Sequence, residues 1–318
     1  MNPTVDDVTD TGYQHPRDPV ELWLARQWQE VIGFAVGIRE NFFQVGGNSL
    51  DAARLINAVL EEFGVQLPLN VMTEHPTVES LATRLRDQNE RLSDPLVPIQ
   101  RGDGTRPPLF LVHPATGQVG AYCHLAQALG EEFTLFGLQA TGLYSDADPV
   151  RTVPAMARAY VDAVRAVRPA GPYLLGGCST GAAIAYEMAT QLAHTGAEVR
   201  LLAVIDVGLL DAVTESWFDE SPRDEDLTGV LDRWKARGVV PQDATPEFVA
   251  RSLRVWQANQ DAVRDWSPQP YSGPLDVFRG PSGDRSPTAD WPVTAVQRVH
   301  EHTTDSRHLA GALHELIG

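Results

Sequence analysis

Ser179 stands in the segment that gives this chain its clearest chemistry. It lies between two glycines, in Gly177-Cys178-Ser179-Thr180-Gly181. The apolar run 173–176 before it predicts a strand, and residues 182–194 after it predict a helix. Glycines on both sides of a strand-to-helix turn permit a sharp bend that lifts a serine hydroxyl above a sheet. The sequence therefore predicts Ser179 as a nucleophile, whereas Cys178 is not framed by the glycines and is expected to fill buried space.

A nucleophilic serine needs a base, and the base needs an orienting acid. Around a turn of this kind the three residues follow the chain order serine, acid, histidine. Asp206 follows the apolar strand predicted at 201–205, which places it at the carboxyl end of the next strand. Asp211 is a nearby alternative, but it lies past the strand end, where an inserted segment begins. We therefore predict Asp206 as the acid.

Four histidines follow the inserted segment, and one of them is expected to be the base. We predict His302, which lies on the loop after the strand ending at Val299 and before the last helix. His300 follows the same strand and stays an alternative, because the sequence fixes element boundaries only to within a few residues. The remaining two fall in or at the edge of the last helix and are expected at the surface: His308 and His314.

Two backbone N–H groups should stabilise the negative charge that develops when Ser179 attacks a carbonyl carbon. One is predicted at Thr180, directly after the nucleophile. The other is expected from the turn His113-Pro114-Ala115-Thr116-Gly117, where we choose Ala115. His113 precedes Ser179 and ends a strand, so we interpret it as a structural residue lining this turn rather than as the base.

A second serine, Ser49, lies in Asn41-Phe42-Phe43-Gln44-Val45-Gly46-Gly47-Asn48-Ser49-Leu50 and opens a predicted helix. The unpaired N–H groups and the positive dipole end at a helix start stabilise a phosphate. Gly46 and Gly47 keep the approach to the hydroxyl free of bulk. A serine at a helix start is most often only a cap, so the local pattern leaves a carrier role and a capping role open.

The elements that would position these serines fall into two groups. Residues 19–85 predict a small bundle of four short helices. From residue 109 onward, apolar strands alternate with helices, which predicts a doubly wound, mostly parallel sheet. Between residues 208 and 266 the strand signal disappears, and two amphipathic helical stretches remain. They predict an active-site lid or, alternatively, an ordinary packing subdomain.

Composition limits the classes of partner. The 318 residues carry 42 acids against 25 bases, and this net charge of −17 argues against nucleic acid or an anionic membrane. No apolar stretch reaches the length of a membrane span, and residues 1–20 are polar rather than a signal peptide. Two cysteines exclude a disulfide scaffold and a cysteine-rich metal site. We expect a cytoplasmic protein without a metal.

Both serine segments resemble known families. Asn-Phe-Phe-x-x-Gly-Gly-x-Ser-Leu, within a match over most of residues 17–86, resembles the attachment motif of peptidyl or acyl carrier domains of assembly-line synthetases. Leu-Phe-Leu-Val-His-Pro-Ala-Thr-Gly, Gly-Gly-Cys-Ser-Thr-Gly and Ala-Val-Ile-Asp resemble type I thioesterases that end non-ribosomal peptide and polyketide assembly lines. The resemblance implies an α/β-hydrolase fold with a helical lid. The domains it implies are a flexible leader (1–17), a carrier domain (18–87), a linker (88–106) and a thioesterase domain (107–318, lid about 208–266).

The resemblance also implies a function. Ser49 would carry a 4′-phosphopantetheine arm, attached by a separate phosphopantetheinyl transferase, and upstream condensation and adenylation domains would supply a peptidyl or acyl thioester. That chain would pass to Ser179 and leave by hydrolysis or macrocyclisation. The alternatives are a carrier and docking module with a non-catalytic hydrolase-like scaffold, and a thioesterase that passes the acyl group to another acceptor. His300-Glu301 departs from the family, which commonly has Gly-Asp before its catalytic histidine.

Overall fold

The computed structural model describes residues 14–68, 70–88, 95–206, 210, 227–236, 240, 244–280, 296–305 and 308–317. The chain divides into two compact units, residues 1–92 and 93–318. Most of the expected leader, part of the expected linker, part of the expected lid and the alternative acid Asp211 lie outside the described residues.

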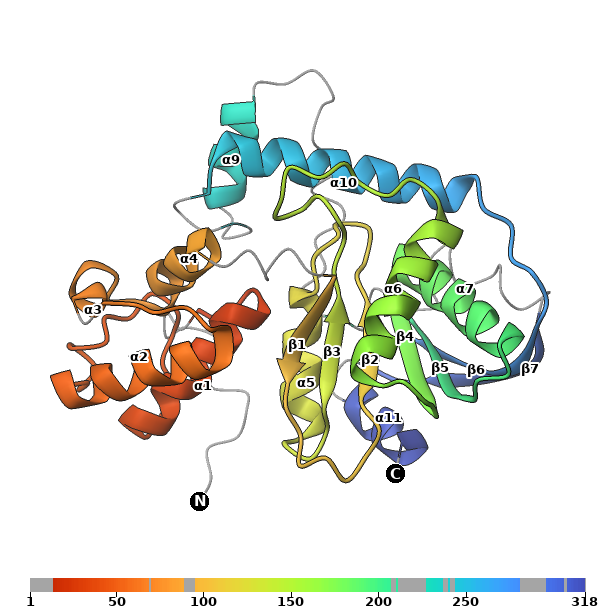
Figure 1. Cartoon of the computed structure of the whole chain (residues 1–318), viewed down its shortest axis with the longest axis horizontal. Coiled ribbons are helices and arrows are strands. Elements are labelled where there is room, and N and C mark those ends of the chain that lie inside the picture. Colours follow the sequence, from red (N-terminus) through yellow and green to blue (C-terminus); the bar gives the residue numbers. More distant parts are fainter. Residues whose placement is uncertain are drawn as a thin grey trace. The chain divides into compact units, whose positions relative to one another are not determined.

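The first unit is a helical bundle around one apolar core (Figure 1). Its helices are α1 (Pro19–Ile32), α2 (Ser49–Phe63), α3 (Val71–Glu74) and α4 (Val78–Gln88), which confirms the predicted helical carrier region. Apolar residues recur every three or four positions, so each longer helix presents one apolar face to the others. The largest buried side chains of this core include Trp28, Phe42, Leu55, Ile38 and Leu24.

Buried charges join the start of α1 to α4. Asp18 caps α1 by accepting hydrogen bonds from the Val20 and Glu21 N–H groups. The fully buried Glu21 carboxylate pairs with Arg17 at 2.5 Å and with Arg86 of α4 at 3.4 Å. Burial alone would raise the pKa of Glu21, but the two guanidinium groups outweigh it and hold that pKa below its ordinary value. The ion pairs therefore hold the first turn of α1 against α4.

The second unit is built on a seven-stranded sheet of order β1-β3-β2-β4-β5-β6-β7 (Figure 1). Only β1 is antiparallel to its neighbour, so the predicted mostly parallel sheet is confirmed. The strands are β1 (Leu96–Gln100), β2 (Leu109–Val112), β3 (Leu135–Leu138), β4 (Tyr173–Cys178), β5 (Val199–Ile205), β6 (Tyr271–Arg279) and β7 (Val296–Thr303).

Strand β1 lies in the segment that we expected to be linker. Its prolines and neighbouring charges suggested a connection, yet Val97 and Ile99 alternate with the exposed Pro98 and are buried. Pro98 lacks an N–H group to donate, and such a residue is tolerated in an edge strand. Residues 96–100 therefore form the edge of the sheet, paired with β3.

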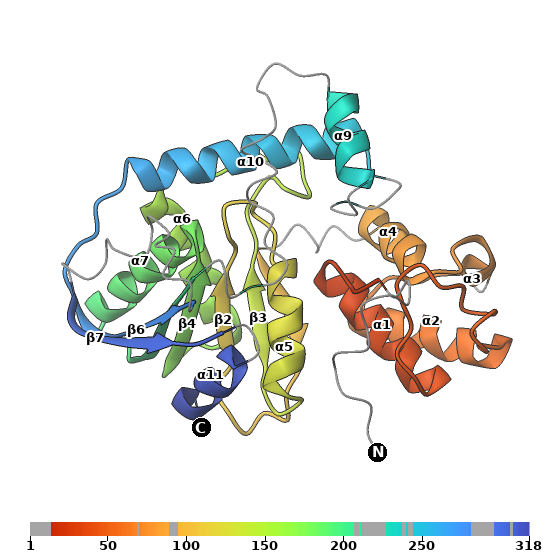
Figure 2. The same cartoon turned by 180° about the vertical axis from the view of Figure 1, so that it is seen from behind.

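Helices cover both faces of this sheet (Figure 1 and Figure 2). One face carries α6 (Val153–Val167) and α7 (Thr180–His194), and the other carries α5 (Cys123–Leu129) with α11 (Leu309–Ile317). The α6–α7 face forms a large apolar core, to which Phe110, Leu175, Tyr186 and Leu202 contribute. Because both faces are covered, the central strands are apolar almost throughout.

The segment inserted between β5 and β6 contributes α9 (Leu227–Ala236) and α10 (Pro246–Arg264), the two helical stretches that the sequence predicts there. Thr245 caps α10 by accepting a hydrogen bond from the Phe248 N–H. Arg251 of α10 pairs with Asp146 in the loop after β3, at 3.6 Å. Helix α10 thus lies across the carboxyl ends of β3 and β2 (Figure 1). Among the described residues, no helix is long and apolar enough to cross a membrane.

A buried histidine fixes the end of β2. The His113 ring has no exposed surface, its Nδ1 lies 2.7 Å from the Pro114 carbonyl oxygen, and its Nε2 lies 2.8 Å from the Tyr160 hydroxyl. Burial lowers the pKa of His113 from 6.5 to about 4. A neutral His113 ring that donates a hydrogen bond from Nδ1 to the Pro114 carbonyl oxygen accepts one at Nε2 from the Tyr160 hydroxyl. His113 is therefore a structural residue, as the sequence predicts.

This buried histidine should make folding stability depend on pH. Above pH 6.5 the ring is neutral in both folded and unfolded chains, whereas between 6.5 and about 4 only the unfolded chain binds the proton. Stability should therefore fall as the pH falls, by roughly 2 to 3 kcal/mol between pH 7 and 4.5. Urea unfolding of wild type and His113→Gln at both pH values measures this. An equal loss in the two proteins would contradict the assignment.

Candidate functional site

Ser179 lies between the last residue of β4 and the first residue of α7, with φ 53° and ψ −128°. Among the described residues it is the one non-glycine residue with a positive φ. Such a conformation costs on the order of 1–3 kcal/mol and persists only where the surroundings enforce it. Ser179 is 8% exposed. The turn therefore has the geometry predicted for a nucleophile.

The two glycines of this turn permit contacts that no side chain would fit. A Cβ on Gly177 would lie 2.5 Å from the Gly181 oxygen, and a Cβ on Gly181 would lie 2.4 Å from the oxygens of both Val112 and His113. The start of α7 therefore touches the end of β2. This contact brings the N–H groups that begin α7 next to the turn that holds Ala115.

Tyr122 joins the end of β2 to the end of β4. Its buried hydroxyl donates to the Val112 carbonyl oxygen at 2.6 Å and accepts from the Cys178 N–H at 3.2 Å. Cys178 itself is fully buried, with its Sγ 3.5 Å from that hydroxyl. Cys178, the residue before Ser179, is thus a packing residue, as expected, and the Tyr122 hydroxyl joins its backbone to that of β2.

The two predicted oxyanion donors come from these adjoining segments. Thr180 is the first residue of α7, where backbone N–H groups have no partner within the helix and the helix dipole is positive. Ala115 is fully buried in a turn closed by a hydrogen bond from the Gly117 N–H to the Pro114 oxygen, 3.0 Å. The Ala115 oxygen accepts from the Asn259 amide of α10 at 3.0 Å.

The predicted base lies in a strand, so the expectation that His302 stands on a loop is wrong. Strand β7 extends to Thr303, and His302 is paired with Phe278 of β6. Its Nε2 lies 2.9 Å from Asp276 Oδ1, and its ring stacks on Phe278 with centroids 4.7 Å apart. His300 Nδ1 lies 3.3 Å from the same oxygen. Two histidines thus share one carboxylate that is 3% exposed.

Sequence reasoning did not select Asp276, because it sought an acid beyond a strand end rather than inside a strand. The register explains the cluster. Asp276 pairs with His300 and Phe278 with His302, and alternate residues of a strand share a face. An aspartate within the apolar run 274–278, with two histidines spaced by two residues on the next strand, was the available signal.

Asp206 follows β5, as the sequence predicts, and its N–H donates to the Phe278 oxygen at 2.9 Å. Since Ile205 pairs with Phe278 and Phe278 with His302, Asp206 lies just beyond the row that contains His302. The structure thus places Asp206 and His302 at the same edge of the sheet with β6 between them. The hydrogen bond that it shows for His302 is with Asp276.

The other two histidines that follow the inserted segment, His308 and His314, make contacts away from Asp276. His308 is exposed and its Nδ1 lies 2.7 Å from Asp305 Oδ1 at the start of α11. The His314 ring packs edge-on against Phe133, with centroids 4.9 Å apart. His308 therefore lies at the surface as expected, whereas His314 is partly covered.

Ser49 is the exposed first residue of α2. Capping belongs to its neighbour, because the Asn48 side chain accepts from the Leu50 and Asp51 N–H groups. Gly46 has φ +114°, and a Cβ on Gly47 would lie 2.4 Å from the Phe42 ring. These features leave an open approach to a serine hydroxyl that no cap occupies, which fits a phosphodiester-linked group at the positive end of α2.

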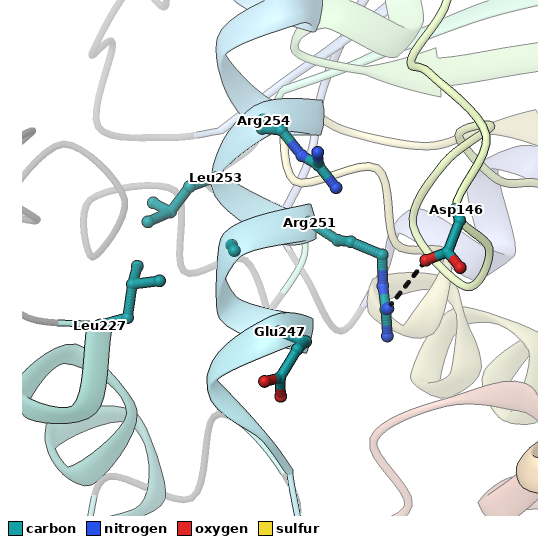
Figure 3. Close-up of a pocket in the computed structure, with 7 residues that line it drawn as sticks. Asp146, Leu227, Glu247, Arg251, Leu253 and Arg254 are labelled. Carbon is teal, nitrogen blue, oxygen red and sulfur yellow. Dashed lines mark ion pairs between the residues drawn. The ribbon is translucent and has the colours of Figure 1, made fainter.

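The inserted helices also line a pocket of about 410 Å³ (Figure 3). Figure 3 shows Arg251 and Arg254 of α10 on the side that carries Asp146, with the Arg251–Asp146 ion pair marked, while Leu227 and Leu253 face each other. The pair connects α10 to the loop after β3. Within the described residues, no group of three or more His, Cys, Asp or Glu side chains is arranged to hold a metal ion.

Comparison with known proteins agrees with this geometry. The model of the thioesterase domain family matches residues 107–318, and that of the phosphopantetheine attachment site matches residues 22–85. A dimodular nonribosomal peptide synthase of Bacillus subtilis (strain 168) is 40% identical over 193 residues, 60% of this chain and 8% of that protein. Malpinin synthetase of Mortierella alpina is 34% identical over 274 residues, 84% of this chain and 4% of that protein.

Solved structures with similar folds include a whole synthetase and a separate thioesterase domain. The four-domain nonribosomal peptide synthetase AB3403, in its holo form bound to AMP and glycine, is similar with a TM-score of 0.75 and 26% identity. The match covers 96% of this chain and 26% of that one. The Vlm2 thioesterase domain, at a TM-score of 0.53, 23% identity and coverage of 70% and 96%, shares the fold. The chain thus belongs to the thioesterase domain family and is a carrier–thioesterase pair of the kind found in nonribosomal peptide synthetases.

Proposed function

We propose that Ser49 carries the phosphopantetheine arm and that Ser179 takes the acyl or peptidyl chain from it and releases the product. The strained backbone of Ser179 at the β4–α7 turn is the observation that carries this proposal. Ser49 supports the first half of the proposal, because it is exposed at the start of α2 and leaves the capping of that helix to Asn48. When attached, the arm supplies a thiol that holds the acyl chain as a thioester.

In the proposed reaction, Ser179 Oγ attacks the thioester carbonyl carbon while His302 removes its proton. The Ala115 and Thr180 N–H groups stabilise the resulting oxyanion. His302 would then donate its proton to the leaving sulfur as the carbon–sulfur bond breaks, and Ser179 would keep the acyl group as an ester. A water molecule, or a nucleophile within the acyl or peptidyl chain itself, attacks this ester and transfers its proton to His302. His302 then returns a proton to Ser179 Oγ as the product leaves.

Two carboxylates are candidates for orienting His302. We propose Asp206 as the acid, because it lies past the carboxyl end of β5, next to the strand whose end holds Ser179. Asp276 is the second candidate, because it makes the hydrogen bond to His302 in this structure. A catalytic role for Asp206 requires the His302 imidazole to turn from Asp276 toward the carboxyl end of β5, where Asp206 lies.

The chain spans less than a tenth of the length of the two curated relatives above. Upstream condensation and adenylation domains as partners, a phosphopantetheinyl transferase that modifies Ser49, and a cytoplasmic location therefore belong to the proposal. The carrier domain and the synthetase relatives support an acyl thioester as the substrate.

Intact mass spectrometry tests the two serines together. A phosphopantetheinyl transferase with acyl-coenzyme A should load wild type, which then loses the acyl group with time. Ser49→Ala should never gain the arm, because it lacks the attachment oxygen. Ser179→Ala should load normally and keep its acyl group, with release slowed at least ~1000-fold, since removing a triad nucleophile abolishes acyl transfer.

Each part of the proposal has its own contradicting outcome. Loading of Ser49→Ala would exclude Ser49 as the attachment site. Acyl loss from Ser179→Ala at the wild-type rate would show a non-catalytic scaffold or another nucleophile. The mass of the released product separates the remaining choices, because hydrolysis adds one water relative to a ring and another acceptor adds its own mass.

A second experiment decides between the two acids. Asp206→Asn should lower the rate constant for acyl-enzyme formation by ~10³-fold or more, since an orienting carboxylate fixes the imidazole tautomer and stabilises its cation. Asp276→Asn should have a much smaller effect if its hydrogen bond holds His302 only between turnovers. Stopped-flow labelling of Ser179 by a chromogenic ester measures both, with His300→Gln as the matched control. The reverse order of effects would assign the acid to Asp276.

A further inference from the structure

We propose that Asn259 of α10 is a positioning residue for the oxyanion hole: its amide holds the turn that presents the Ala115 N–H. The inference rests on the proposed roles of Ser179 and Ala115. It extends the catalytic site to the helical segment inserted between β5 and β6.

One buried hydrogen bond carries the proposal. Asn259 Nδ2 donates to the Ala115 oxygen at 3.0 Å, between residues 144 positions apart in the chain. Asn259 is 1% exposed and Ala115 is fully buried. A buried amide is costly unless it is hydrogen-bonded, and without Asn259 the Ala115 carbonyl loses this donor. This buried bond therefore joins α10 to the turn that holds Ala115.

Packing against α10 makes the turn conform to this bond. Gly117 has φ +81°, and a Cβ there would lie 2.6 Å from Val255 Cγ1 and 2.9 Å from Ala140 Cβ. Val255 is fully buried one turn before Asn259 and lies on the same face of α10. The Gly117 oxygen also accepts from the Ala140 N–H at 3.0 Å. The turn thus lies between α10 and the chain that leaves β3.

The direction of the Ala115 N–H follows from these constraints. The Gly117 N–H bonds the Pro114 oxygen, so both peptide groups that flank Ala115 have their carbonyls fixed, one by Gly117 and one by Asn259. The Ala115 N–H lies in the peptide group of the Pro114 carbonyl, whereas Asn259 holds the peptide group that follows Ala115. Without the Asn259 bond, this second peptide group turns and displaces the Gly117 N–H that closes the turn on the Pro114 oxygen. The Pro114–Ala115 peptide group then loses its fixed direction, and its N–H loses it too. An oxyanion donor must aim at the site where charge develops, so rotation of this turn weakens its stabilisation of the transition state.

The same bond makes the oxyanion hole depend on the position of α10. The helix contacts the loop after β3 through the Arg251–Asp146 pair, which is marked in Figure 3. A shift of α10 along the sheet edge would carry Asn259 with it and move the Ala115 turn. The inserted segment would thereby influence the chemical step as well as access to the site.

Steady-state kinetics of the full chain on an acyl-N-acetylcysteamine thioester test this role. Asn259→Leu keeps the side-chain volume but removes the donor, so kcat should fall ~10- to 100-fold, part of the 10²–10³ that loss of an oxyanion donor costs. KM should stay within about threefold. The inhibition constant of a boronic acid, which forms a tetrahedral anion on Ser179, should rise by the same factor as kcat falls.

Gln257→Ala is the matched control. Gln257 lies on the same helix and donates to Asp261 at 2.9 Å rather than to the turn, so its loss should leave kcat and the boronic acid constant within twofold of wild type. Titration of Ser179 with a fluorophosphonate counts folded, reactive protein in every variant. Equal kcat per titrated site in Asn259→Leu and wild type would overturn the inference.

Asn259→Asp supplies a readout that a purely structural role would not change. At neutral pH its carboxylate would face the Ala115 carbonyl oxygen and repel it, whereas the protonated acid would donate a hydrogen bond. The ratio of its kcat to that of wild type should therefore rise as the pH falls from 8 to 5, and a flat ratio would overturn the inference. Full turnover and boronic acid binding by Ser179→Ala would instead refute the proposed function.

Discussion

A serine with positive φ stores on the order of 1–3 kcal/mol of backbone strain, so Ser179 keeps φ 53° only because its neighbours permit no relaxed alternative. Strand β4 fixes the residue before it, helix α7 begins at the residue after it, and Gly181 lies against the carbonyls that end β2. Straightening the turn would pull α7 away from β2. The strain is thus balanced by the packing of α7 in the apolar core on this face of the sheet.

The segment after β2 shows how such a site is kept in place without regular structure. Three carbonyl groups, at the last residue of β2 and in the segment after it, accept hydrogen bonds from buried side chains: Val112 from Tyr122, Pro114 from His113, and Ala115 from Asn259. These side chains come from the segment before α5, from the residue that follows β2 and from α10. A buried loop must satisfy its backbone polar groups in this way, because no strand or helix pairs them. The loop therefore depends on distant parts of the sheet unit for its shape.

Local patterns in the sequence were sufficient for the places of the two serines in the backbone, the helices of the carrier region and most of the parallel sheet. A strand-turn-helix with flanking glycines depends on neighbours in the chain, and so does the Asn48-Ser49 helix start. Strand β1 and the cluster at Asp276 were not predictable in the same way. Both depend on pairing between distant strands: β1 with β3, and Asp276 with His300 across β6 and β7. Register decides which side chains meet, and periodicity does not reveal register.

The two serines have opposite environments, and the proposed division into a carrying and a releasing serine depends on that difference. Ser49 is exposed, lies in relaxed helical backbone and leaves capping to Asn48, so its hydroxyl is accessible to a modifying enzyme. Ser179 is 8% exposed and lies at the strained turn between β4 and α7. Burial therefore gives Ser179 the low-dielectric surroundings in which oriented dipoles stabilise charge, and exposure suits Ser49 to a covalent attachment.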